Sequence, residues 1–334
     1  MSKKTKKITS IGGSALIEGI MMRGPKRSTV CVRTGENEIY SEDVNITTLA
    51  EKCGLFKVPF FRGIAGLIDS MRLSYKSLML AADKAIEGAE IEEEPSKFEK
   101  WLDEKFGDKL VSILMTFASI IGVALAVGLF LFLPSFLFDL TANFIPAFKI
   151  DEAAHNEEMV RLYKSIFEGV LKIVLFLGYI VIVSQMGEMK RVFQYHGAEH
   201  KTIFCYENEE ELTIPNVKKQ TRFHPRCGTS FLVIMLLLSI IVGLFVPANP
   251  FGIAWLRPVF KILLIPVTCG LGYELIKLCG KHDNTLTRII AAPGLWAQRI
   301  TTKEPDDKMI EVAIEAIKAV IPEDGSDIVN NCGC

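Results

Sequence analysis

The sequence predicts a mainly α-helical polytopic membrane protein with about four transmembrane helices and a small N-terminal α+β unit in the cytoplasm. Three observations predict this class. Hydrophobic residues make up 49% of the 334 residues, they are concentrated in a few long runs, and basic residues gather in one loop between two of those runs. The formal net charge of −1 argues against a nucleic-acid partner, because proteins that bind nucleic acid normally carry a basic excess.

The predicted α+β unit covers residues 1–50. The stretches STVCVRT and NEIYSED alternate apolar and polar residues on either side of Gly35–Asn37, which predicts a β-hairpin. The first residues carry lysines that no apolar run follows directly, so we expect no cleavable signal peptide.

Residues 51–109 are predicted to form an amphipathic helix followed by a charged linker. Apolar residues recur at helical spacing between Phe60 and Met79, with charged residues between them. Such a helix can lie on a membrane surface, or it can pack on a cytoplasmic core. The sequence leaves both arrangements open.

Residues 110–278 form the predicted membrane domain. Its first span is a run of about 25 residues without a charged side chain, which is enough to cross ~30 Å of hydrocarbon as a helix. The four predicted spans are Leu110–Pro134, Ile166–Met186, Ser230–Pro247 and Pro258–Leu278. The second and the fourth contain charged residues, among them Glu168, Lys172, Lys261 and Glu274, and could be re-entrant instead of crossing.

The distribution of lysine and arginine predicts the orientation of the spans. The loops on the other side hold few basic residues. The loop 187–229 is rich in them, and it contains Lys190, Arg191, Lys201, Lys218, Lys219, Arg222 and Arg226. Because basic loops stay in the cytoplasm, we expect a multi-pass membrane protein with both termini and this loop on the cytoplasmic side.

Residues 279–334 form the predicted cytoplasmic C-terminal segment. It contains an amphipathic helix, Pro305–Ile321, whose apolar face holds Met309, Ile310, Ala313, Ile314, Ile317 and Val320. The eight cysteines show no disulfide framework, which indicates reduced thiols in a reducing compartment. Cys332 and Cys334 could hold a soft metal or belong to a disordered terminus.

The stretch YHGAEHKT in the basic loop has the spacing of a metal site. On a helix, His196 and His200 differ by ~40° in direction, so both imidazoles can reach one ion. Glu199 lies three positions after His196, and this H-x-x-E-H order is the one found in the inverzincins. In such sites the histidines hold Zn²⁺ and the glutamate accepts a proton from water whose pKa falls toward ~7.

Further ligand types are available in the same loop. The stretch RFHPRCGTS places His224 and Cys227 three apart just before the third span, where antiparallel spans would bring them to the same face as the first motif. Glu207 is another possible ligand. The full set of predicted metal ligands is His196, His200, His224, Cys227, Glu207 and Glu274, with Glu199 as the catalytic base and a divalent ion, expected to be zinc, as the cofactor.

Glu274 is included for two reasons. Inverzincins recruit a glutamate from a distant helix, and an ionisable residue inside a span is a functional candidate because burying it unpaired is costly. Its alternative role is a structural pair with Lys277 or with a polar group of another span.

Two functions from different classes fit these residues. One is a membrane-integral metal-dependent hydrolase that acts at the cytoplasmic face on a membrane-associated peptide or lipid-linked substrate. The other is a non-catalytic scaffold or assembly factor with a structural metal site or with none. Four ligands from His196, His200, His224 and Cys227 would close a zinc site, so the ligand types alone leave a structural zinc open.

Four stretches in order carry a resemblance to a known family: GGSALIEGIMMRGP (Gly12–Pro25), PFFRG (Pro59–Gly63), YHGAEHKTI with HPRCGTSF, and APGLWAQRITTKEP (Ala292–Pro305). On these stretches the chain resembles the bacterial YqhQ-like family of membrane proteins over nearly its whole length. The resemblance implies a protein of the bacterial cell (inner) membrane with a domain of unknown function, predicted to be a metal-dependent enzyme. The family's metal motif carries over to His196, Glu199, His200, His224 and Cys227.

Overall fold

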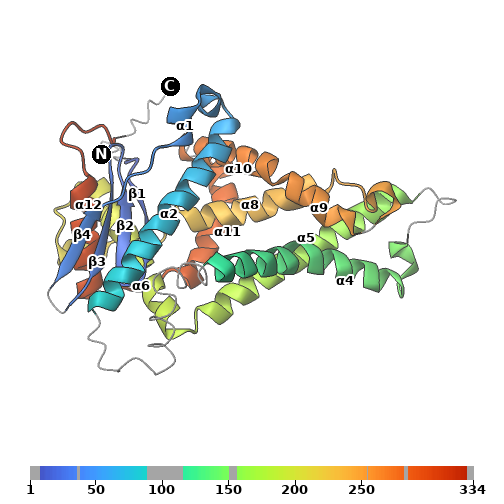
Figure 1. Ribbon diagram of the computed structural model, residues 1–334, viewed down its shortest axis with the longest axis horizontal. Coiled ribbons are helices and arrows are strands. Elements are labelled where there is room, and N and C mark those ends of the chain that lie inside the picture. The colour runs from blue at the N-terminus through green and yellow to red at the C-terminus, as the bar shows by residue number, and fades with distance from the viewer. Residues whose placement is uncertain are drawn as a thin grey trace, which may run out of the picture. The chain divides into compact units, whose positions relative to one another are not determined.

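The computed structural model describes residues 8–35, 38–88, 116–149, 156–253, 255–281 and 285–328 (Figure 1). The chain forms two compact units. The first combines Met1–Ala89, Leu177–Met235 and Pro266–Cys334, and the second combines Glu90–Phe176 and Leu236–Ile265. Most of the predicted charged linker, and the pair Cys332 and Cys334, lie outside the described residues.

A four-stranded antiparallel sheet lies at the start of the first unit. Its strands pair in sequence order: β1 (Gly12–Leu16), β2 (Gly19–Arg23), β3 (Ser28–Arg33) and β4 (Ile39–Asp43). The pairing of β3 with β4 confirms the predicted hairpin. The hairpin of β1 and β2 was not predicted, and its two-residue turn contains Glu18 at a φ of 48°, a left-handed conformation that is uncommon for a residue with a side chain.

Helices from three distant parts of the chain cover both faces of this sheet (Figure 1). Ile20 and Met22 on β2 pack into one core with α6 (Gly187–Glu207) and α12 (Asp307–Val320). Met21, between them, packs into a second core with α2 (Phe61–Gly88). Alternate residues of a strand point to opposite faces, so a strand buried on both sides is apolar throughout.

The two predicted amphipathic helices both pack on the sheet. Helix α2 uses Leu73 and Ala81 for this contact, while Met71 and Tyr75 on its other side are exposed. Helix α12 confirms the prediction for Pro305–Ile321, and Asp306 caps its start by accepting a hydrogen bond from the Met309 amide (2.8 Å). All residues of its predicted apolar face are buried: Met309, Ile310, Ala313, Ile314, Ile317 and Val320.

Two described helices are long and apolar enough to cross a membrane, Thr116–Ala142 and α5 (Glu157–Val183). The first includes a π-helical turn, η2 (Gly128–Phe132), followed by α4 (Leu133–Ala142). A third candidate consists of α9 (Leu256–Leu263) and the part of α10 (Ile265–Lys281) up to Leu278, which are bent by 45° relative to each other.

The third predicted span corresponds to a shorter helix. Helix α8 (Gly228–Gly243) has 16 residues, or ~24 Å at 1.5 Å per residue, which is less than the ~30 Å of a hydrocarbon core. The described part of the chain therefore holds two candidate spans, or three if the bent pair is one span. A total of four spans stays a prediction.

The remaining elements are short connections and one longer helix: α1 (Leu49–Lys52), η1 (Gly54–Lys57), η3 (Pro146–Phe148), α7 (Ile214–Lys219), η4 (Pro250–Gly252) and α11 (Thr285–Thr301). Helices α6 and α7 occupy most of the basic stretch 187–229, which the sequence indicated as a loop between spans with a helix at the histidine motif.

Candidate metal centre

Helix α6 holds the two histidines of the H-x-x-E-H motif on one face, as their spacing predicts. The ring centroids of His196 and His200 are 4.4 Å apart, and both residues are buried. This half of α6 packs on β1 and α12, so its polar side chains lie inside the first unit rather than in solvent.

Backbone carbonyl groups fix the orientation of both rings. His196 Nδ1 is 2.9 Å from the Thr301 carbonyl oxygen, and His200 Nδ1 is 2.5 Å from the Arg222 carbonyl oxygen. Because a carbonyl oxygen only accepts, each Nδ1 must carry the proton, and the lone pair of each ring is therefore on Nε2. Histidines that bind metals are held by this kind of hydrogen bond.

Cys227 completes a group of three donor atoms. It immediately precedes α8, and its Sγ is 3.1 Å from His196 Nε2. Ligand atoms of His196, His200 and Cys227 all lie within 4.8 Å of one another. These three residues could hold a metal ion, since zinc binds both imidazole and thiolate and its catalytic sites have three protein ligands.

The electrostatics of the cluster agree with such a use. Burial by itself raises the pKa of the Cys227 thiol, but the nearby His200 ring and the hydrogen bonds from Thr229 outweigh it, so the pKa falls below its ordinary value. Burial lowers the pKa of His200 and favours its neutral ring. His200 Nε2 is buried and near the Cys227 thiol, and within the described residues it has no hydrogen bond of ordinary geometry. A buried nitrogen in this position is unfavourable unless a further group binds there.

Glu199 lies beside the cluster with one carboxylate oxygen unused. Its side chain is buried, burial raises its pKa to about 7, and Oε2 has no hydrogen-bond partner among the described residues. The Gly13 amide on β1 hydrogen bonds to the carboxylate. A Cβ on Gly13 would lie 3.0 Å from Glu199 Cδ, so only glycine lets β1 approach this closely.

His224 is adjacent to the cluster but directed away from it. Its ring centroid is 5.5 Å from that of His200. The Arg226 amide donates to His224 Nδ1 (3.3 Å), so the proton of the neutral ring is on Nε2, which lies 3.8 Å from Glu207 Oε2. Glu207 in turn accepts from the Thr9 amide (3.0 Å) and pairs with Arg226. Neither His224 nor Glu207 belongs to the three-donor group.

Glu274 lies on α10 and pairs with an arginine. Arg62, at the start of α2, donates from Nε (2.7 Å) and from Nη2 (2.5 Å) to the two carboxylate oxygens. The Phe60 amide donates to the same carboxylate at 3.3 Å. The structure therefore does not bring Glu274 to the metal cluster, and its partner is Arg62 rather than Lys277.

Sequence reasoning missed Gln298, a buried residue of α11 that positions the turn before Cys227. Its amide side chain accepts from the His224 backbone amide (2.8 Å) and donates to the His224 carbonyl (2.7 Å) and to Ser230 Oγ (3.0 Å). A buried glutamine that hydrogen bonds on both sides of Cys227, to His224 before it and to Ser230 of α8 after it, holds this turn against the helix. Gln298 lies in the APGLWAQRITTKEP stretch, which carried the family resemblance but did not indicate this role.

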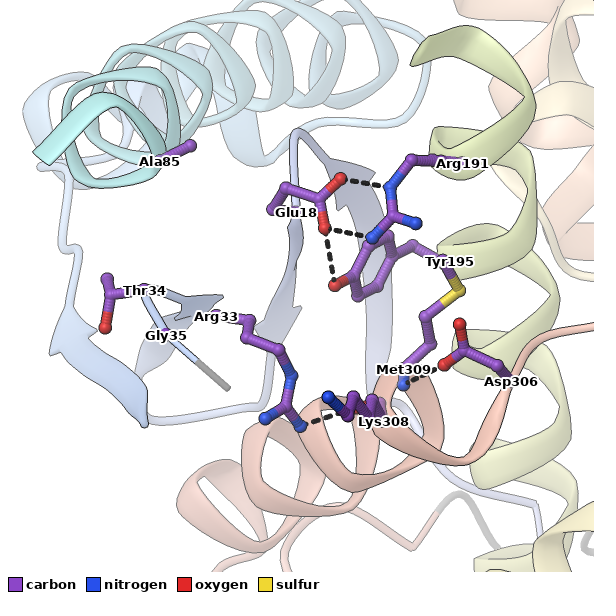
Figure 2. A pocket seen from close by; sticks show the side chains of 10 residues that line it. All are labelled: Glu18, Arg33, Thr34, Gly35, Ala85, Arg191, Tyr195, Asp306, Lys308 and Met309. Atoms are coloured by element: carbon purple, nitrogen blue, oxygen red, sulfur yellow. Dashed lines mark hydrogen bonds and ion pairs between the residues drawn. The ribbon is translucent and has the colours of Figure 1, made fainter. Parts of the chain in front are cut away.

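Glu18 fixes the other end of α6 to the sheet. Arg191 and Tyr195, both on α6, converge on the Glu18 carboxylate in the turn between β1 and β2 (Figure 2). The Tyr195 hydroxyl donates to Oε2 at 3.2 Å and Arg191 Nη2 donates to the same atom at 2.5 Å. These residues line an open depression of about 450 Å³. These contacts hold α6 against the sheet at Tyr195, the residue directly before His196.

Gly197, inside the motif, has no room for a side chain. A Cβ there would lie 2.0 Å from the Lys303 carbonyl oxygen, because the Lys303 amide hydrogen bonds to Phe193 of α6 (2.8 Å). We expect Gly197→Ala to lower the free energy of unfolding by about 1–3 kcal/mol, as overpacked core positions do, and thermal unfolding of the purified chain measures this. Gly187→Ala, on the same helix but with nothing within 4 Å of its Cβ, should leave stability unchanged or slightly raised. Equal effects of the two substitutions would contradict the close packing at Gly197.

Comparisons with known proteins agree on one family. The family model described as "Protein of unknown function (DUF1385)" matches residues 58–323. The chain is similar to "Uncharacterized protein YqhQ" of Bacillus subtilis (strain 168), at 33% identity over 321 residues that cover 93% of this chain and 92% of the relative. No solved structure matches the chain.

Proposed function

The chain belongs to the DUF1385 family, whose description states no activity, and from the geometry of its His196, His200 and Cys227 cluster we propose that it is a membrane-integral metal-dependent enzyme of the hydrolase class. The observation that carries the proposal is the pair of imidazoles fixed by the Thr301 and Arg222 carbonyls, which leaves both Nε2 lone pairs for a ligand beside Cys227 Sγ. We take the ion to be zinc, because its preferred ligands are imidazole and thiolate.

Each residue of the site has a separate task in this proposal. His196, His200 and Cys227 hold the ion, which when bound supplies Lewis acidity and makes water more acidic. Glu199 does not bind the ion; its free Oε2 accepts the proton that the reacting water loses and then returns it to the leaving group. The buried position of Glu199 excludes bulk water from this proton transfer.

The number of donors favours an enzyme over a structural site. Structural zinc sites are closed by four protein ligands, whereas catalytic sites have three and keep a position for water. The described residues bring three donors together, and His224, the fourth candidate, is directed at Glu207. If His224 turned to close the site, the alternative function, a scaffold or assembly factor with a structural metal, would fit better.

Metal analysis of the purified chain tests the proposal. We expect about one equivalent of zinc per chain in the wild type and none in the double variant His196→Asn/His200→Asn, with the same helical content by circular dichroism. A wild type that takes up no zinc after loading, or a double variant that keeps it, would remove the basis of the enzyme proposal.

We also propose that the site faces the cytoplasm at the bacterial inner membrane, where a membrane-associated peptide or lipid-linked substrate could reach it. The basic residues of the stretch 187–229 support this orientation. In a variant with exposed Cys53 replaced by serine, a membrane-impermeant thiol reagent added to intact cells should label Glu152→Cys and leave Asn208→Cys unlabelled. Labelling at 208 without labelling at 152 would reverse the orientation.

A further inference from the structure

Charged side chains lie at four-residue intervals on two helices of the second unit. Helix α5 carries Lys164, Glu168 and Lys172, and α9 carries Arg257 and Lys261. Residues four apart differ by only ~40° around a helix, so each set lies on one face. All five residues are buried, within helices whose other residues are mostly apolar.

Glu168 lies at the centre of these five residues, which together with Asp139 of α4 we call the basic cluster. It is 1% exposed, Arg257 Nε lies 3.3 Å from its Oε1, and Lys261 pairs with its Oε2. Arg257 is fully buried, and its other nitrogens donate to Ser165 Oγ (2.7 Å) and to backbone carbonyls, including that of Pro247 (2.7 Å). The guanidinium therefore has a complete set of partners.

The two outer lysines of α5 differ in their partners. Lys164 pairs with Asp139 of α4 at 2.5 Å. Lys172 is 3% exposed, and no residue of the described structure forms a hydrogen bond or a close ion pair with its amine. Glu168 and Arg257 are nevertheless near enough to act on it electrostatically. A protonated amine in such a place is disfavoured unless a negative charge balances it.

The basic cluster has more positive than negative charge. Four formally basic side chains, those of Lys164, Lys172, Arg257 and Lys261, lie with two formally acidic ones, Asp139 and Glu168, so the count of side chains gives a formal surplus of two positive charges. We propose that the cluster binds an oxyanion of the phosphate class at Lys172, either free phosphate or the phosphate monoester headgroup of a lipid. A dianion matches the surplus, and lysine amines bind phosphate as point charges. This site is separate from the His196, His200 and Cys227 cluster and does not depend on the proposed function.

Phosphate-dependent stability of the full chain tests the proposal. In detergent at constant ionic strength set with sodium chloride, inorganic phosphate should raise the melting temperature of the wild type in a saturable manner. Lys172→Met keeps the length of the side chain and removes its charge, and it should weaken the apparent phosphate affinity by roughly tenfold or more. Lys84→Met removes a lysine that pairs with Glu87 in the first unit, and it should keep the wild-type response.

A second arm distinguishes the two sources of phosphate. Nanodiscs of neutral lipid with added phosphatidate should stabilise the wild type and not Lys172→Met if a headgroup is the ligand, whereas only inorganic phosphate should do so if the ligand is free. Glu168→Gln, where it folds, should strengthen either response, because it adds to the positive surplus. The proposal fails if neither phosphate nor phosphatidate stabilises the wild type, or if Lys172→Met responds as the wild type does.

Discussion

Replacement of His200 by asparagine is expected to abolish zinc binding at the proposed site, and the same replacement at His224 is expected to preserve it. Asparagine keeps a polar atom near the position of Nδ1 and has nothing at the position of Nε2. In His200→Asn the side-chain amide can still donate to the Arg222 carbonyl, so the fold is kept while the donor atom is lost. In His224→Asn the side-chain oxygen can still accept from the Arg226 amide.

The size of the effect follows from the number of donors. Loss of one outer partner of a zinc ligand already costs about 10–100-fold in affinity, so loss of one of three direct ligands should weaken binding by more than ~100-fold. Zinc affinity is measured by competition with a chromophoric chelator, with zinc content measured on the same samples. For His224→Asn we expect a change of less than ~10-fold, because His224 supplies no atom to the three-donor group and its Nε2 faces Glu207.

Comparison of the two variants also determines whether the metal has three or four protein ligands. Should both substitutions abolish zinc binding equally, with both proteins folded, the site has four ligands. The three-donor arrangement would then be wrong for the metal-bound protein. A structural zinc site with four protein ligands would be favoured over a catalytic one.

Glu199→Gln is expected to keep the zinc and abolish function. The substitution preserves the size of the side chain and removes its ability to accept a proton, so a reaction that needs this base should slow by ~10²–10⁴-fold. Complementation of a deletion strain measures function, and zinc content is measured on the same variant. His200→Asn should lose both.

Glu188→Gln is the matched control for Glu199→Gln. It changes the same residue type on the same helix, at an exposed position in the first turn, and should complement fully. In a structural site, Glu199→Gln would be nearly silent while His200→Asn still destabilised the fold, because metal binding contributes to folding. Full complementation by Glu199→Gln would therefore end the hydrolase proposal.

The local part of the site could be predicted from the sequence. The spacing of His196 and His200 is a property of any helix, and the ligand type of Cys227 made it a candidate. The orientation of His224 could not be predicted, because it depends on the Arg226 amide and on Glu207. Gln298 was missed for the same reason: its role arises from contacts with a turn 74 positions away.

The fold also has parts that local sequence patterns predict and parts that they do not. The β3–β4 hairpin and α12 follow from patterns within a few residues, and both predictions are confirmed. The covering of the sheet by α2, α6 and α12 depends on contacts between distant segments that no local pattern encodes. The charges of α5 were visible in the sequence, but their arrangement around Glu168 needed the partners on α9.

The two ends of the first unit meet, and this sets the timing of its assembly. The Ser10 amide donates to the Asp327 carbonyl (2.7 Å), and Thr9 Oγ1 donates to the Asp327 carboxylate across 318 positions of the chain. At a synthesis rate of ~5–20 residues per second, the sheet emerges from the ribosome roughly 15–60 s before its last partner. In that interval the apolar faces of β2 and β3 have no α12 to cover them, and His196 lacks the Thr301 carbonyl that orients it. The unit can therefore close, and the His196 ring can be oriented, only after the helices of the intervening second unit have been made.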